Sequence, residues 1–103
     1  MNFPAMIPWG WMVPLSIACG NTVVLKASSQ TPLTAMRIME LFYTEGGFPK
    51  GVVNLVTCSR VEADILLTDE RVKAVTFVGT TGVGKQVYSK AAAHGKRVQA
   101  QCE

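Results

Sequence analysis

Apolar and polar segments alternate along the chain and predict a series of helices and short strands. Residues 5–18 are apolar on all sides, which predicts a helix buried on most of its surface, and Gly20 is well suited to end it. Residues 22–26, with the sequence TVVLK, form a short β-branched run, which indicates a buried strand. A polar loop then leads to Thr31-Pro32, a typical helix start with an N-cap residue followed by proline.

The remaining chain repeats this pattern. The helix that starts at Thr31 is expected to run to about Glu45 and to stop at the sequence GGFP. Further strands are predicted at 51–57, 73–78 and 97–102, with helices between them. Strands that alternate with helices through short loops are typical of right-handed βαβ units, so the expected fold class is α/β with a Rossmann-like parallel sheet. The first long helix carries one apolar face, formed by Ala35, Ile38, Met39 and Phe42.

The turn after the third strand carries the clearest candidate chemistry. Its sequence, VGTTGVGK, matches the G-x-x-x-x-G-K phosphate cradle of a P-loop, but Gln86 stands where a P-loop needs a hydroxyl for Mg²⁺. The same residues fit a dinucleotide-binding turn, in which a helix N-terminus faces a pyrophosphate. A third interpretation is a structural turn without a ligand. In parallel sheets ligands bind beyond the carboxyl ends of the strands, and both this turn and the turn KASSQ are predicted to lie there.

Composition and charge narrow the class of protein. A hydrophobic content of 49% is high for a free-standing chain of 103 residues, so we expect a part of a larger protein. The net charge of +3 comes from scattered Lys and Arg residues, which argues against a nucleic-acid partner. Three widely spaced cysteines indicate neither a disulfide framework nor a metal site, and they favour a reducing, cytoplasmic setting. The apolar opening lacks a basic flank and holds three prolines, which favours a buried helix over an export signal or a membrane anchor.

Five segments follow one another along the chain: NFPAMIP, GNTVVLKASSQTPLTA, FPKGVVNLV, FVGTTGVGK and HGKRVQA. In this order and at these spacings they resemble the coenzyme-binding half of the aldehyde dehydrogenase superfamily. The first and the last are most similar to its methylmalonate-semialdehyde branch, whose members acylate coenzyme A. The resemblance implies that residues 1–103 are a fragment of an NAD(P)-binding domain without the catalytic domain. It also implies a parent that oxidises a semialdehyde through a cysteine thioester and assembles as a homo-oligomer.

The resemblance assigns the glycine-rich turn to the coenzyme. The family's G-x-T-x-x-G pattern falls on Gly79, Thr81 and Gly84. Gly79 is expected to allow a close backbone approach, and Thr80 to offer its hydroxyl to a pyrophosphate oxygen. A dinucleotide, NAD or NADP, is therefore the expected cofactor.

The strand-end turn KASSQ is assigned to the other end of the coenzyme. By resemblance, Lys26 reaches the hydroxyls of the adenine ribose, and Ser28 and Ser29 share its turn. The family usually has a glutamate at the position of Ser29, which would repel the 2′-phosphate of NADP. Because Ser29 is neutral, we expect NADP to be tolerated.

The resemblance also describes what this chain contributes to catalysis. Asn2 matches an asparagine whose amide stabilises the oxyanion formed when a thiolate attacks the aldehyde. Cys19, Cys58 and Cys102 do not match the nucleophile, so the chain alone is expected to be inactive. Gln101 replaces the glutamate base of hydrolytic members, which favours coenzyme A over water as the acyl acceptor. The alternatives are a non-catalytic dinucleotide-binding or structural module and, as a weaker one, a P-loop nucleotide-binding protein.

Overall fold

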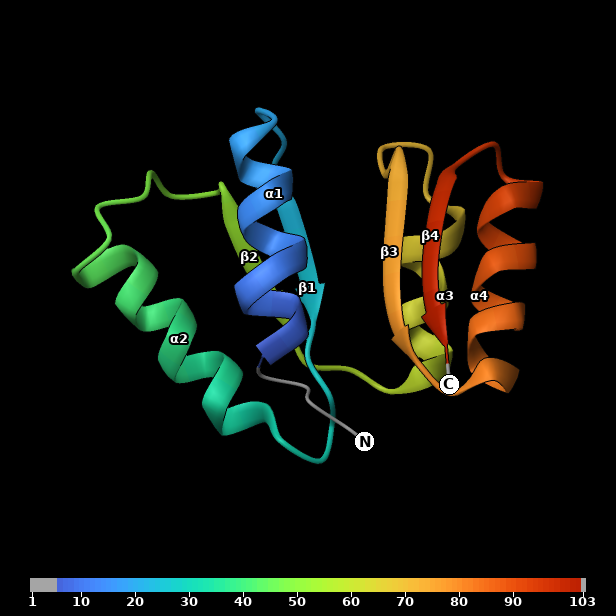
Figure 1. The fold of residues 1–103 in the computed structure, drawn as a ribbon, viewed down its shortest axis with the longest axis horizontal. Helices are drawn as coiled ribbons and strands as arrows, with labels where there is room; N and C mark the ends of the chain where they lie inside the picture. Colours follow the sequence, from blue (N-terminus) through green and yellow to red (C-terminus); the bar gives the residue numbers. More distant parts are fainter. Residues whose placement is uncertain (1–5, 103) are drawn as a thin grey trace. The chain divides into compact units, whose positions relative to one another are not determined.

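The computed structural model of the chain describes residues 6–102. The chain divides into two compact units, Met1–Ser59 and Arg60–Glu103. Each unit contains one pair of parallel strands with helices packed on it (Figure 1). The expected alternation of parallel strands and helices is therefore confirmed.

The first helical segment of the first unit contains a π-helical turn, η1 (Pro8–Met12), which continues into α1 (Val13–Ala18). Trp9 and Val13 are buried, but Met6, Trp11 and Leu15 are exposed. The expected burial on most sides is thus wrong for this structure, because a pair of strands covers only one face of a helix. No helix within residues 6–102 combines the length and apolar character needed to cross a bilayer.

The strands of the first unit are β1 (Val23–Lys26) and β2 (Val53–Val56), paired in parallel from Val23↔Val53 to Lys26↔Val56. Helix α2 (Pro32–Thr44) begins after Thr31 as predicted. Its predicted apolar face is confirmed, since Ala35 is buried in the core and the other three side chains pack against it. The Phe42 ring lies 5.4 Å from that of Trp9, so the two helices meet over the strands.

The second unit contains α3 (Arg60–Thr68), β3 (Ala74–Gly79), α4 (Thr81–Ala93) and β4 (Arg97–Cys102). The strands pair in parallel from Ala74↔Arg97 to Gly79↔Cys102. Helix α4 packs along both strands, and α3 packs against α4 (Figure 1). An ion pair from Lys90 to Asp64 links the two helices.

A buried lysine holds together the ends of β3 and β4 that lie opposite the glycine turn. Lys96 is only 7% exposed, and its ammonium donates hydrogen bonds to the carbonyls of Asp69 and, at 2.6 Å, of Val72. These carbonyls belong to the turn between α3 and β3, while Lys96 stands just before β4. A buried charge is tolerated only where its donors are satisfied, so Lys96 ties this turn to the start of β4.

The same turn is closed by an exposed ion pair. The backbone N–H and the guanidinium of Arg71 both donate to the Asp69 carboxylate, at 2.6–2.9 Å. These bonds hold the pKa of Asp69 well below its usual range. The pKa of Asp69 is thus lower in the folded chain than in the unfolded chain. The ion pair therefore stabilises the fold at pH values above the ordinary carboxyl pKa, and this stabilisation is lost as the pH falls below it.

We expect Lys96→Met to lower the free energy of unfolding by about 2 kcal/mol, because two carbonyls lose a charged donor. Urea denaturation of the unaltered and substituted chains measures the change. Lys73→Met is the matched control, since Lys73 is exposed and its ammonium bonds to one carbonyl, that of Glu70. Equal effects of the two substitutions would show that burial of the Lys96 ammonium contributes nothing.

Candidate functional site

The glycine-rich turn is a very short connection between a strand and a helix. Strand β3 ends at Gly79 and α4 begins at Thr81, so only Thr80 lies between them. Thr80 is extended, with φ −66° and ψ 148°, and its carbonyl accepts the N–H of Gly84 at 2.9 Å. The Thr80 side chain makes no capping bond to the helix. The first N–H groups of α4, which no preceding turn can pair, thus lie at the carboxyl end of β3.

This geometry differs from a P-loop. A P-loop wraps its backbone around a phosphate between the two glycines, whereas here Thr81 to Lys85 already form the first turns of α4. Gln86, at the position of the Mg²⁺-binding hydroxyl, accepts a hydrogen bond from Arg60 of α3. The structure therefore argues against the P-loop interpretation and favours a strand–turn–helix connection.

Two glycines of the turn lie close against side chains of their own unit. A Cβ added at Gly79 would lie 2.7 Å from the ring of Phe77, closer than real Cβ atoms approach. A Cβ added at Gly84 would likewise lie closer than 3.0 Å to the Cys102 sulfur, and 3.5 Å from the same Phe77 ring. At Gly82 a Cβ would meet nothing within 4 Å. Gly79 and Gly84 thus leave room for the side chains of Phe77 and Cys102. The place of Phe77 in an apolar run did not reveal this contact.

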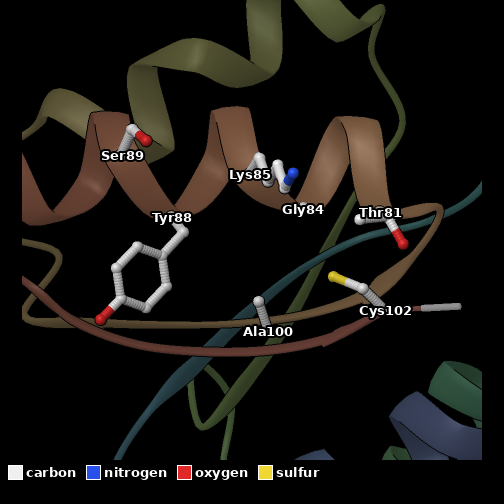
Figure 2. Close-up of a pocket in the computed structure, with 7 residues that line it drawn as sticks. All are labelled: Thr81, Gly84, Lys85, Tyr88, Ser89, Ala100 and Cys102. Carbon is white, nitrogen blue, oxygen red and sulfur yellow. The ribbon is translucent and has the colours of Figure 1, made fainter.

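An open hollow of about 290 Å³ lies between α4 and β4. Figure 2 shows Cys102 and Ala100 of β4 on one side of it, facing side chains of α4. The Cys102 sulfur points toward α4, and the Tyr88 ring lies over the opposite end (Figure 2). The residues on the helix side are Thr81, Gly84, Lys85, Tyr88 and Ser89.

The second candidate group lies in the first unit. Lys26 is the last residue of β1, and the turn after it is held by the N–H of Ala27, which donates to Val56. Ser28 bonds within this turn, because its hydroxyl accepts the N–H of Gln30 at 3.3 Å. Ser29 is exposed. Lys26, Ser28 and Ser29 thus stand between the carboxyl end of a parallel strand and the start of α2, as predicted.

The residues discussed above for catalysis are Asn2, the three cysteines and Gln101, and the structure describes all of them except Asn2. Asn2 lies outside the described residues. Cys19 follows α1 and Cys102 ends β4, and both are exposed, while the half-buried Cys58 lies in the loop between β2 and α3; all three are free thiols. Gln101 is exposed in β4, opposite Val78 of β3. Within residues 6–102, no cluster of His, Cys, Asp or Glu is suited to hold a metal ion.

Comparison with known proteins decides the family. The profile of the aldehyde dehydrogenase family matches residues 1–103. The chain belongs to the aldehyde dehydrogenase family. Malonate-semialdehyde dehydrogenase 1 of Oceanobacillus iheyensis is 57% identical to this family member over 99 residues, which are 96% of the chain and 20% of that relative.

Solved structures of the family agree with the fold. Methylmalonate-semialdehyde dehydrogenase from Oceanimonas doudoroffii shares 46% identity and a TM-score of 0.92, over 98% of this chain and 20% of that one. A Sinorhizobium meliloti protein described by the same enzyme name, in complex with NAD, shares 42% identity and a TM-score of 0.92 over the same fractions. This aldehyde dehydrogenase chain thus spans about a fifth of the length of the relatives that it matches.

Because the turn is not a phosphate cradle, we expect the aldehyde dehydrogenase chain to show no Mg²⁺-dependent affinity for ATP. Calorimetric titration with Mg-ATP, with NAD as the comparison ligand, measures this directly. Lys85→Ala should leave both results unchanged, since Lys85 is exposed on α4. Tight Mg-ATP binding that Lys85→Ala abolishes would restore the P-loop interpretation.

Proposed function

We propose that this chain is the NAD(P)-binding part of an aldehyde dehydrogenase that oxidises malonate or methylmalonate semialdehyde and transfers the acyl group to coenzyme A. The observation that carries the proposal is the uncapped N-terminus of α4 at the carboxyl end of β3, in a member of this family. The names of the relatives support the semialdehyde. The relative solved with NAD supports the coenzyme.

The residues of the second unit fit a dinucleotide. The first N–H groups of α4, which no preceding helical turn can pair, and the positive end of the α4 dipole favour the negative charge of a pyrophosphate. Thr80 has a hydroxyl that is not used to cap its helix, so it can donate to a phosphate oxygen. Gly79 and Gly84 bring this helix end close to the strand. When bound, the nicotinamide coenzyme supplies the hydride acceptor of the oxidation.

The residues of the first unit fit the adenine ribose. The Lys26 ammonium is a donor for the ribose hydroxyls at the end of β1, and Ser28 shapes the turn beside it. Ser29 adds a neutral hydroxyl where a carboxylate would repel a 2′-phosphate. This arrangement favours the acceptance of NADP beside NAD.

The chain alone supplies only part of the reaction. We propose that Asn2 donates to the oxyanion, while the nucleophilic cysteine and the catalytic domain belong to a longer protein. None of the three thiols stands at the nucleophile position, so residues 1–103 alone are expected not to oxidise an aldehyde. A homo-oligomer in the cytoplasm, without nucleic-acid or membrane partners, completes the proposal.

The acyl acceptor follows from Gln101, whose amide cannot take a proton from water. In the full-length protein, oxidation of malonate or methylmalonate semialdehyde with NAD is expected to speed up when coenzyme A is added and to yield the acyl-CoA. Gln101→Glu introduces a base, so it should raise the yield of free acid and reduce the dependence on coenzyme A. Rates of NADH formation and analysis of the products measure both effects.

The matched control is Gln99→Glu, which adds the same charge at an exposed position of the same strand. It should leave the dependence on coenzyme A unchanged. Free acid formed at full rate by the unaltered protein without coenzyme A would contradict the proposed acceptor. NAD binding without oxidation of either semialdehyde would instead support the non-catalytic module.

The coenzyme preference is expected to depend on the charge at position 29. Ser29→Glu should lower kcat/KM for NADP relative to NAD by roughly thirtyfold, because a carboxylate repels the 2′-phosphate and one charge-assisted bond is lost. Ser29→Gln is the control of similar size without the charge, and it should cost much less. Equal kcat/KM ratios in all three proteins would show that position 29 plays no part in the choice.

A further inference from the structure

One contact fixes how closely α4 lies against β4. Gly84 is buried in the first turns of α4, and Cys102 is the last residue of β4. The Cys102 sulfur lies where a side chain at position 84 would begin, since an added Cβ would come closer to it than 3.0 Å. Figure 2 shows this sulfur directed toward α4 between Thr81 and Ala100. The thiol therefore fills the space that the glycine leaves.

The other neighbours of Gly84 leave ordinary room. The same added Cβ would lie 3.5 Å from the Phe77 ring and 3.6 Å from the Cβ of Cys102, both normal van der Waals separations. Only the sulfur would be too close. The Cys102 sulfur can avoid an added Cβ only by rotation about its Cα–Cβ bond into another staggered position. The sizes of the residues at positions 84 and 102 thus limit how closely α4 approaches β4 at this point.

This point lies beside the candidate coenzyme turn. Gly79 pairs with Cys102 in the strand ladder, and Thr80 follows Gly79 directly. The Thr80 carbonyl accepts the N–H of Gly84. A shift of the helix at position 84 is therefore passed through one hydrogen bond to Thr80 and to the first N–H groups of α4.

We propose that Cys102 is a positioning residue for the dinucleotide: its thiol, seated against Gly84, sets the height of the first turn of α4 above the strand ends. The sulfur acts by its volume, with no covalent or redox step. The inference rests on the proposed coenzyme function, and it gives a role to a cysteine that does not match the nucleophile.

A double-mutant cycle in the full-length protein tests the contact. Gly84→Ala should weaken NAD binding and raise the KM for NAD by roughly tenfold or more, with a smaller change in kcat, because the added methyl displaces the turn. Cys102→Ala in the same protein removes the sulfur and leaves two Cβ atoms at an ordinary distance. The double variant should therefore recover most of the lost affinity. NAD titration and steady-state kinetics give the readouts.

Gly10→Ala is the control, since it adds the same methyl at an exposed helical position of the first unit where nothing lies within 4 Å. It should leave NAD affinity unchanged. If Gly84→Ala fails to fold, recovery of a cooperative melting transition in the double variant supports the contact equally.

Three results would overturn the inference. One is a Gly84→Ala variant that behaves like Gly10→Ala, and another is a double variant no better than Gly84→Ala in binding or folding. The third, absence of NAD binding by the unaltered protein, would remove the proposed function and this inference with it. That failure is distinguishable because it shows before any substitution is made.

Discussion

Close packing between a helix and a strand is the constraint on which the candidate coenzyme turn depends. With a single residue between β3 and α4, the helix must fold back at once along the strands that precede and follow it. Such a reversal brings backbone and side chains close together, and Gly79 and Gly84 stand where an added Cβ would need a neighbouring side chain to move. The same one-residue connection places the N-terminus of α4 at the carboxyl end of β3. The short turn thus accounts both for the close packing and for the affinity of this helix end for an anion.

Parallel pairing repeats this logic in both units. Parallel strands require a crossover, and here each crossover is a helix that begins just beyond a strand end. Lys26 ends β1, and Thr80 directly follows the end of β3, so each lies between a strand and the helix of its crossover. The opposite ends are closed by structural devices, such as the buried Lys96 ammonium in the second unit. The division places stability at one end of the strands and the candidate chemistry at the other.

Local sequence signals were sufficient for most elements. Thr31-Pro32 and the sequence GGFP marked the start and the end of α2, because helix start and stop signals are local. The burial of residues 6–18 could not be predicted, since an all-apolar segment does not reveal which face has a neighbour. Cys102 was missed as a partner of Gly84 because that contact joins residues far apart in the chain, and Phe77 was missed because an apolar run does not show where each ring lies. The ligands themselves were inferred from resemblance, as side-chain types alone left a P-loop open.

The π-helical turn of the first helix has a consequence for the alignment of its buried side chains. In a regular α-helix, four residues overshoot a full turn by about 40°, so a stripe of every fourth residue drifts around the axis. In a π turn the same four residues fall short of a full turn. Trp9 to Val13 spans the wide turn and Val13 to Ile17 the regular one; Trp9 and Val13 belong to the core cluster, and Ile17 packs against it. The overshoot of the regular turn and the shortfall of the wide turn have opposite signs. The widened turn therefore keeps these three side chains in one straight stripe along the helix.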